Sequence, residues 1–356
     1  MSRYKVVGQP WRAKGAVDVS DCQTAEEVMI KAGLDFQVQK CELVAKMPII
    51  NPTDDILDKI NEDVNNGFAF IKNTDVYKEC PNAFATYRTD RNIPLGTVKS
   101  KYEVVQNTTA FKFFNDAIGK DKAIWQTAGA FGSGERIFVS AKLPNNIRVK
   151  GDIIENYLVF TNSHDGSGSV NILFTPIRII CQNTLNAAIR QTDCYLRFRH
   201  TSSVHGKILS AQEILGITKQ RTDAVQEMLE QLSNITFSDE EVMEYIAKTY
   251  LTEAEYNNIK TVDAKEGIKK TIQRYGYILE EAGISTRKAN IMADTFNYYL
   301  DGPGQPEYRG TAYGAYNAIT GYYSNVANLE GFKRMDSLLY GNASRVTSNA
   351  LSLMFE

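Results

Sequence analysis

Cysteine and histidine are scarce in this chain of 356 residues, which has five cysteines and three histidines. The cysteines are odd in number and widely spaced, which argues against a disulfide framework. None of them forms a CxxC pair, so a zinc ribbon is also unsupported. We expect small core thiols at most of these positions, which are Cys22, Cys41, Cys80, Cys181 and Cys194.

Long apolar runs are also lacking. Nowhere do about 18 consecutive apolar residues occur, as a membrane-spanning helix requires. The first twenty residues contain no apolar stretch typical of a secretory signal. The sequence therefore predicts a protein of the cytoplasm that has no membrane partner.

Motifs of nucleotide and covalent chemistry are missing as well. The chain has no GxxxxGK[ST] loop and no GxSxG elbow. Gly129, Gly132 and Gly134 fit a hairpin turn better than a dinucleotide loop, because no helix opens directly after them. Cys181 follows an apolar run and is expected to be a buried thiol rather than a nucleophile. We therefore predict no catalytic residue and no cofactor, and the pattern favours a protein that is not an enzyme.

What the chain does contain is a mixed pattern of strands and helices, with 43% hydrophobic residues for a core. Thr24 and Glu27 have the spacing of a capping box, and residues 54–66 can form an amphipathic helix. Asn107 is a plausible N-cap for the next helix. Residues 124–143 alternate around a glycine-rich turn and predict a hairpin. The fold class expected is α+β.

The pattern becomes helical after about residue 208. Ser238 is a predicted N-cap, and a tyrosine-rich helix follows the glycine- and proline-rich linker near residue 301. Tyr316, Ile319 and Tyr323 can share one packed stripe of that helix. We predict a mixed core domain over 1–207, a helical region over 208–300, and a linker with a helical tail over 301–356.

Positive charge is concentrated in residues 178–207, where five basic residues stand against one acidic residue in a chain of net charge −2. Alternation in DCYLRFRHTS predicts that Tyr195, Arg197 and Arg199 share one strand face. Guanidinium groups at alternate positions suit phosphates, and a tyrosine beside them can stack on bases. A solvated strand face explains the same pattern equally well. Candidate nucleic-acid ligands here are Arg178, Tyr195, Arg197, Arg199 and Lys207.

Further cations lie on earlier strand-like segments. Arg88, Lys99 and Lys101 are added to the candidate nucleic-acid ligands. Lys99 and Lys101 can equally protect an edge strand from unwanted pairing.

His164 and Asp165, in TNSHDGSGS, could form a metal or acid/base pair, with His200 as a third member. The alternative is a polar turn, since Asn, Asp, Gly and Ser all favour turns. We predict the turn and no metal site.

Several separated blocks resemble a known family. YRTDRNIPLGTVKSKYEVVQN, ERIFVSAKLP, TNSHDGSGSV, PIRIICQNTLNAA and GTAYGAYNAIT occur in the order seen in the phage/plasmid-like family, a domain of unknown function found on mobile elements. This resemblance implies a bacterial host cell and supplies no catalytic residues.

A more remote similarity is to ring-forming single-strand annealing recombinases. It implies a small curved antiparallel sheet with packed helices, a basic groove for single-stranded DNA, and a homo-oligomer that could be a ring. Annealing needs no ATP, which agrees with the missing nucleotide loop. On this hypothesis Arg197 and Arg199 contact phosphate, Tyr195 stacks, and Arg178 and Lys207 extend the path.

Two other functions stay open. A metal-dependent nuclease would use His164, Asp165 and His200. A structural or host-defence-interacting protein would instead use the acidic helical third as its working surface and would not bind DNA.

Overall fold

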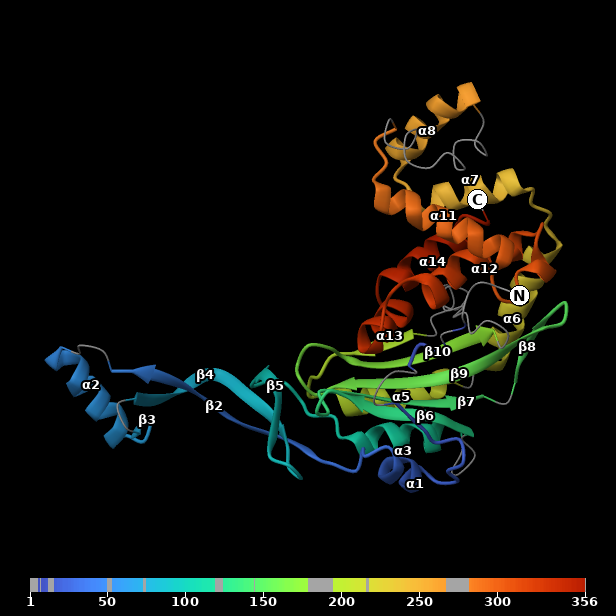
Figure 1. The fold of residues 1–356 in the computed structure, drawn as a ribbon. Coiled ribbons are helices and arrows are strands. Elements are labelled where there is room, and N and C mark those ends of the chain that lie inside the picture. Colours follow the sequence, from blue (N-terminus) through green and yellow to red (C-terminus); the bar gives the residue numbers. More distant parts are fainter. Residues whose placement is uncertain are drawn as a thin grey trace.

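The computed structural model describes residues 6, 8–11, 16–49, 53–72, 75–118, 124–143, 145–178, 195–215, 218–266 and 282–355. The chain forms a body built on one large sheet, an arm that leaves the body on a second sheet, and a helical head over the body (Figure 1). Antiparallel sheets followed by a mainly helical carboxyl-terminal region confirm the predicted α+β class. No helix in the described part of the chain is long and apolar enough to cross a membrane.

The body sheet is antiparallel and runs in the order β1-β6-β7-β9-β10-β11, with the short β8 paired to β9. The predicted hairpin is present as β6 and β7, paired from Phe131 and Arg136 outward with a register shift between Trp125 and Thr127. The strands are β1 (Ala16–Asp18), β6 (Ile124–Phe131), β7 (Arg136–Lys142), β8 (Ile147–Val149), β9 (Asp152–Ser163), β10 (Val170–Arg178) and β11 (Tyr195–Phe198).

Alternation along these strands divides the core between two faces of the sheet. On one face Val139, Phe160 and Ile172 pack with Phe113 and Phe114. That face is covered by α1 (Ala25–Lys31), α3 (Asn107–Ile118) and α5 (Val204–Leu215). The capping box of Thr24 and Glu27 is confirmed at the start of α1.

On the other face Phe138, Tyr157 and Leu173 pack with Trp11 and with Met335 and Leu339 of α13 (Gly331–Leu339). This contact places α13 over one face of the sheet (Figure 1).

The head is one cluster of helices around α12 (Ala312–Gly321), in which every residue is buried. A helix that is apolar all round belongs at the centre of a helical layer. The predicted tyrosine stripe is therefore packed, and the Ser238 cap is confirmed. The other head elements are α6 (Thr218–Asn234), α7 (Asp239–Tyr250), α8 (Glu253–Glu266), α11 (Thr286–Asp301), η1 (Pro306–Tyr308), η2 (Tyr322–Val326) and α14 (Asn342–Ser352).

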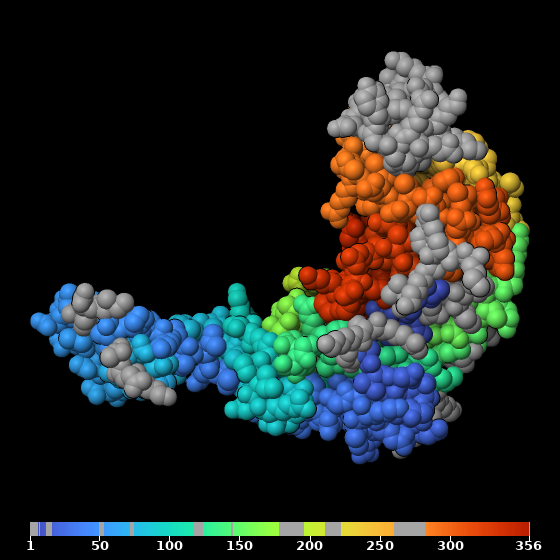
Figure 2. All heavy atoms as spheres, in the orientation of Figure 1, coloured from blue at the N-terminus to red at the C-terminus, as the bar shows by residue number. Residues whose placement is uncertain are grey.

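The arm is a second antiparallel sheet in the order β2-β4-β3, with β5 paired to β4 near the body. It comprises β2 (Val38–Pro48), α2 (Asp54–Asn65), β3 (Ala69–Lys72), β4 (Asp75–Arg88) and β5 (Ile93–Lys99). The amphipathic helix expected over 54–66 is α2. The long strands β2 and β4 carry α2 and β3 well away from the body (Figures 1 and 2).

Candidate anion-binding groove at the corner of the fold

A groove of about 560 Å³ lies between one end of the body sheet and α13, and we call it the corner groove. Its walls come from β7, β9, β10, β11, the turn over residues 164–169, and the C-terminal helices. It is lined by Arg136, Ile137, Thr161, Asn162, Ser163, Ser167, Gly168, Ser169, Asn171, Arg197, Phe332, Asp336, Tyr340 and Gly341. Hydroxyl and amide groups thus dominate its surface.

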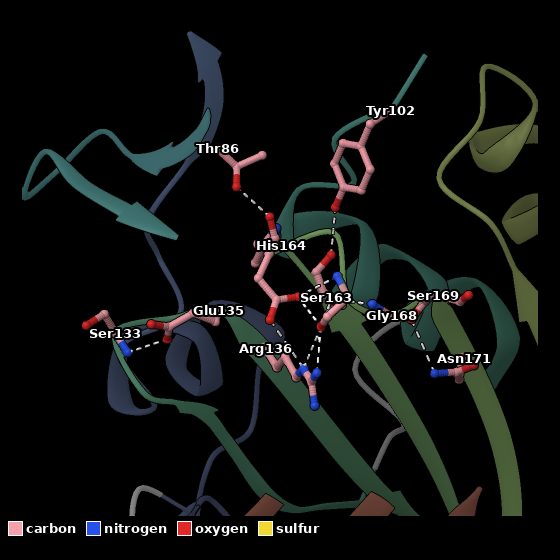
Figure 3. Close-up of polar contacts among 12 residues, drawn as sticks. Thr86, Tyr102, Ser133, Glu135, Arg136, Ser163, His164, Gly168, Ser169 and Asn171 are labelled. Atoms are coloured by element: carbon pink, nitrogen blue, oxygen red, sulfur yellow. Dashed lines mark hydrogen bonds and ion pairs between the residues drawn. The ribbon is translucent and has the colours of Figure 1, made fainter. Parts of the chain in front are cut away.

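The turn that borders the groove is organised around Asp165. Its Oδ1 accepts hydrogen bonds from the hydroxyls of Ser163 and Ser167 and from the Ser167 backbone amide at 3.0 Å. Gly168 N donates to Ser163 Oγ at 3.0 Å, which closes the turn (Figure 3). The TNSHDGSGS segment is therefore a polar turn, as its composition predicts.

Burial acts to raise the pKa of Asp165, but the hydrogen bonds from Ser163 and Ser167 and the charge of Arg136 outweigh it and hold the pKa below its usual value. Asp165 is consequently an anion at neutral pH, and its charge is already engaged by the turn.

Arg136, the first residue of β7, reaches over the turn from one side. Its Nε and Nη2 donate to Ser167 Oγ, the former at 3.2 Å, and Nε lies 3.6 Å from Asp165 Oδ2 (Figure 3). The guanidinium carbon sits 3.9 Å from the centre of the Phe332 ring, a cation–π contact. These contacts fix the orientation of the guanidinium group at the groove.

Arg197 of β11 reaches the groove from the opposite side. Its Nε donates to Ser169 Oγ at 3.1 Å, and the residue is exposed. Three strand spacings separate β7 from β11, so the two arginines arise about 14 Å apart across the sheet. The floor between them is polar: Asn171 donates to Thr161 at 3.1 Å, and Thr161 lies 3.2 Å from the Tyr340 hydroxyl.

Alternation on β11 is as expected from the sequence. Leu196 and Phe198 pack against the core on one side, while Arg197 is exposed on the other, and Arg199 is exposed just beyond the strand. The backbones of Arg178 and Tyr195 belong to β10 and β11, but their side chains lie outside the described part of the structure.

Lys99 and Lys101 are exposed at the end of β5. Lys101 precedes Tyr102, whose ring stacks on His200 with centroids 4.4 Å apart. Because Arg199 precedes His200, this stacked pair brings the Lys101 and Arg199 backbones into one region beside the corner groove. Tyr102 also donates to the Ser163 carbonyl at 2.6 Å, which links β5 to the groove.

Two other candidate ligands lie elsewhere. Arg88 is buried: its guanidinium carbon is 3.8 Å from the centre of the Phe36 ring, and its nitrogens donate to Asp90 and to the Ser133 carbonyl. It holds the arm to the β6–β7 hairpin. Lys207 is exposed on α5, which packs on the sheet face opposite Arg197. Neither residue lines the corner groove.

His164 is fully buried below the turn, and its Nε2 donates to Asn107 Oδ1 at 2.8 Å. Burial lowers the pKa of His164 to about 4, so the ring is neutral at pH 7. His200 also has a lowered pKa because of burial, and its Nδ1 donates to the Glu103 carbonyl at 2.9 Å. Among the described residues, no group of three or more His, Cys, Asp or Glu side chains could hold a metal ion.

Asn107 does not cap the helix as expected. It is the first residue of α3, and its amide donates to the Leu34 carbonyl while its oxygen accepts from His164. Its side chain therefore serves tertiary contacts, which a local capping pattern cannot reveal.

Sequence reasoning also missed Arg136, Ser167, Ser169 and Asn171. The available indication was that ERIFVSAK and TNSHDGSGS could pair: Arg136 and Ser163 are partners in the register of β7 and β9. Only that register brings the arginine to the turn.

A family model described as a domain of unknown function, DUF932, matches residues 94–350. The chain belongs to this family. The DUF932 match begins inside β5 and includes every residue that lines the corner groove, whereas β2, α2, β3 and β4 of the arm precede it. No match was found among curated proteins or among solved structures.

Proposed function

We propose that this DUF932 protein binds single-stranded nucleic acid along the corner groove. The observation that carries the proposal is the placement of Arg136 and Arg197 on opposite sides of a floor of hydroxyl and amide groups. Such groups are the usual ligands of phosphate oxygens, and they bind the backbone without reading sequence.

Arg199 and Lys101 support a path longer than one phosphate. Both are exposed and precede the stacked Tyr102 and His200 in sequence, and Tyr102 donates to the carbonyl of Ser163, which lines the groove. A strand held by its phosphates in this way would leave its bases accessible for pairing.

In its most specific form the proposal is ATP-independent annealing of single strands during recombination of a phage or plasmid. The resemblance to mobile-element proteins and the missing nucleotide loop support it, and a cytoplasmic site of action in a bacterial host follows from it. The buried and neutral His164 supports a binding role for the turn more than metal-dependent cleavage.

The test is binding of labelled single-stranded and duplex DNA, measured by fluorescence anisotropy from about 50 to about 200 mM salt without nucleotide or divalent metal. Arg136→Ala/Arg197→Ala should weaken binding of the single strand and reduce the salt slope by about 0.7 for each phosphate that is no longer neutralised. Lys207→Ala is the matched control, because it removes an exposed cation from the other side of the sheet.

Salt-sensitive binding that the double variant loses and the control keeps would support the groove, and an annealing assay with complementary strands would then test the specific form. If the wild-type protein does not bind at the lowest salt concentration, the nucleic-acid proposal is wrong.

A further inference from the structure

The far end of the arm presents large apolar side chains to solvent. Six of them are between 38% and 61% exposed, on β2, α2, the turn before β3, and β3: Met47, Ile56, Leu57, Phe68, Phe70 and Ile71. Single exposed apolar residues are normal, but a group at one end of a projecting arm marks an interaction surface. We call this group the arm tip.

The arm tip is also incompletely filled. A cleft of about 310 Å³ lies between α2 and the sheet, where Ile56 and Ile60 face Met47 and Val76. Only Val76 of these four is fully buried, so the helix has room to accept apolar groups from a partner.

The described residues of the body and head do not cover the arm tip. β2 has 11 residues, which span about 36 Å at the usual rise of a strand. Figure 2 shows the arm projecting clear of the head, with open space between them. A surface that covers the arm tip would therefore come from another molecule.

Charge restricts what that molecule can be. Residues 48–80 contain seven acidic and three basic residues, and α2 alone has five acidic residues against Lys59. A net charge of −4 repels nucleic acid and repels the tip of a second copy. The partner surface must combine apolar groups with positive charge.

The head of this same chain has such a surface. A groove of about 830 Å³ lies between α11, η2 and α13, and we call it the head groove. Its apolar lining includes Ile291, Leu329 and the two tyrosines Tyr322 and Tyr323. Those tyrosines open a single π-helical turn, a feature that is frequent at functional sites.

The head groove also has the complementary charge. Arg287 lines it, and Arg287 and Arg345 are both close enough to Tyr323 to act on its hydroxyl. Asp294 balances Arg287 in the lining, and Arg345 beside Tyr323 leaves one positive charge in excess around the tyrosines. An acidic helix with apolar side chains matches this groove, as amphipathic helices match grooves generally.

We propose that the arm tip of one copy docks into the head groove of a second copy, with α2 entering first. Because two different surfaces meet, the contact is head-to-tail and generates a closed ring or an open filament. The proposal does not depend on nucleic-acid binding.

The test is the molar mass of the full chain in solution, by light scattering and sedimentation, across a range of protein concentrations. Asp55→Lys/Asp58→Lys reverses the charge at these two positions of α2 and brings the net charge of residues 48–80 from −4 to zero. Arg287→Glu/Arg345→Glu reverses the charge at two positions of the head groove. We expect each double variant to dissociate at least tenfold more readily than the wild type, and the protein that combines all four substitutions to regain assembly. Arg148→Glu, an exposed position on β8 outside both surfaces, is the control for charge reversal alone.

A wild-type protein that is monomeric at every concentration would overturn the proposal. So would assembly that survives either double variant, or that the combined variant fails to restore although circular dichroism shows it folded. Binding of a short single-stranded oligonucleotide by the dissociated variants is measured as well. It tests the corner groove independently of assembly, so a failure of one proposal can be told from a failure of the other.

Discussion

Arg136 Nε and Asp165 Oδ2 lie 3.6 Å apart where β7 meets the turn that follows β9. The same carboxylate accepts hydrogen bonds from the hydroxyls of Ser163 and Ser167. Its main contacts are therefore within the turn, and the ion pair with Arg136 is an additional contact. Arg136 is held in place by Ser167 and the Phe332 ring as well. The corner groove therefore has a guanidinium group that is positioned before any ligand arrives.

Replacing Asp165 by asparagine should loosen this turn. The charge that strengthens its hydrogen bonds is removed, and we expect the free energy of unfolding to fall by about 1–2 kcal/mol. Because the pKa of Asp165 is lowered in the folded protein, its contribution is complete above about pH 4 and is lost in acid below that. Urea denaturation near neutral pH is the measurement. Asp223→Asn at an exposed position on α6 is the control and should leave the midpoint unchanged.

His164 predicts a second pH dependence. Its folded pKa of about 4 lies below the ordinary histidine value of 6.5, so the unfolded chain takes up the proton first. The contribution of the neutral ring is complete above about pH 6.5 and is lost as the pH falls toward 4, with a total of about 3 kcal/mol. The difference in unfolding free energy between the wild type and His164→Gln should therefore shrink between about pH 7 and about pH 4.5.

His205→Gln is the matched control, since that ring is exposed on α5. A difference between wild type and His164→Gln that stays constant over this pH range would contradict the assignment of a buried neutral ring.

Gly96 of β5 shows how closely the arm approaches the turn. A Cβ at this position would lie 2.4 Å from the backbone carbonyl oxygen of Asp165. Because that oxygen belongs to the backbone, it cannot move aside as a flexible side chain could. Gly96→Ala should therefore shift the arm away from the turn and lower the melting temperature. Gly206→Ala is the opposite case, because nothing lies within 4 Å of the added methyl group in α5. We expect that variant to be more stable by about 0.5–1 kcal/mol.

Thermal unfolding of the two glycine variants, with limited proteolysis to report on the arm, checks this prediction. Equal melting temperatures for the two would mean that the backbone contact between β5 and the turn has no effect on stability.

Local sequence patterns were sufficient to predict many helices and strands, and to predict Arg197 on one side of the corner groove. Alternation predicted that Arg197 points away from the core-facing Leu196 and Phe198, and capping residues located α1 and α7. The exposure of a cation was harder to predict. Arg88 and Arg197 both sit on alternating strands, yet Arg88 turns inward because Asp90 and Phe36 receive it.

Relationships between distant segments could not be predicted in the same way. Arg136 reaches the turn only because β7 pairs with β9 in one register, and no local signal fixes that register. Likewise, α2 was identifiable as an amphipathic helix, but only β2 and β4 show that it is carried away from the body (Figure 1). The apolar residues of the arm tip are exposed because of where the arm places α2, which the sequence of the helix alone does not reveal.

Arg334 of α13 joins the amino-terminal segment at residues 8–9 to the C-terminal helices by hydrogen bonds. It is buried, and its guanidinium donates to the carbonyls of Gly8, Gln9 and Ser324 at 2.7 to 3.0 Å. Burial lowers its pKa to about 10, which still leaves it charged at pH 7. Its hydrogen bonds hold residues 8–11, including the fully buried Trp11, against the sheet.

Arg334→Met should leave three buried carbonyl groups without their donor, and we expect the free energy of unfolding to fall by about 3 kcal/mol. Trp11 packs on Tyr157 with ring centroids 5.4 Å apart, so its release should also change the tryptophan fluorescence of a chain that has two tryptophans. Arg148→Met, at an exposed position on β8, is the matched control and should change stability by no more than about 0.5 kcal/mol. If Arg334→Met keeps both the native fluorescence and the native stability, the amino-terminal segment is held by the apolar packing of Trp11, and the arginine contributes little.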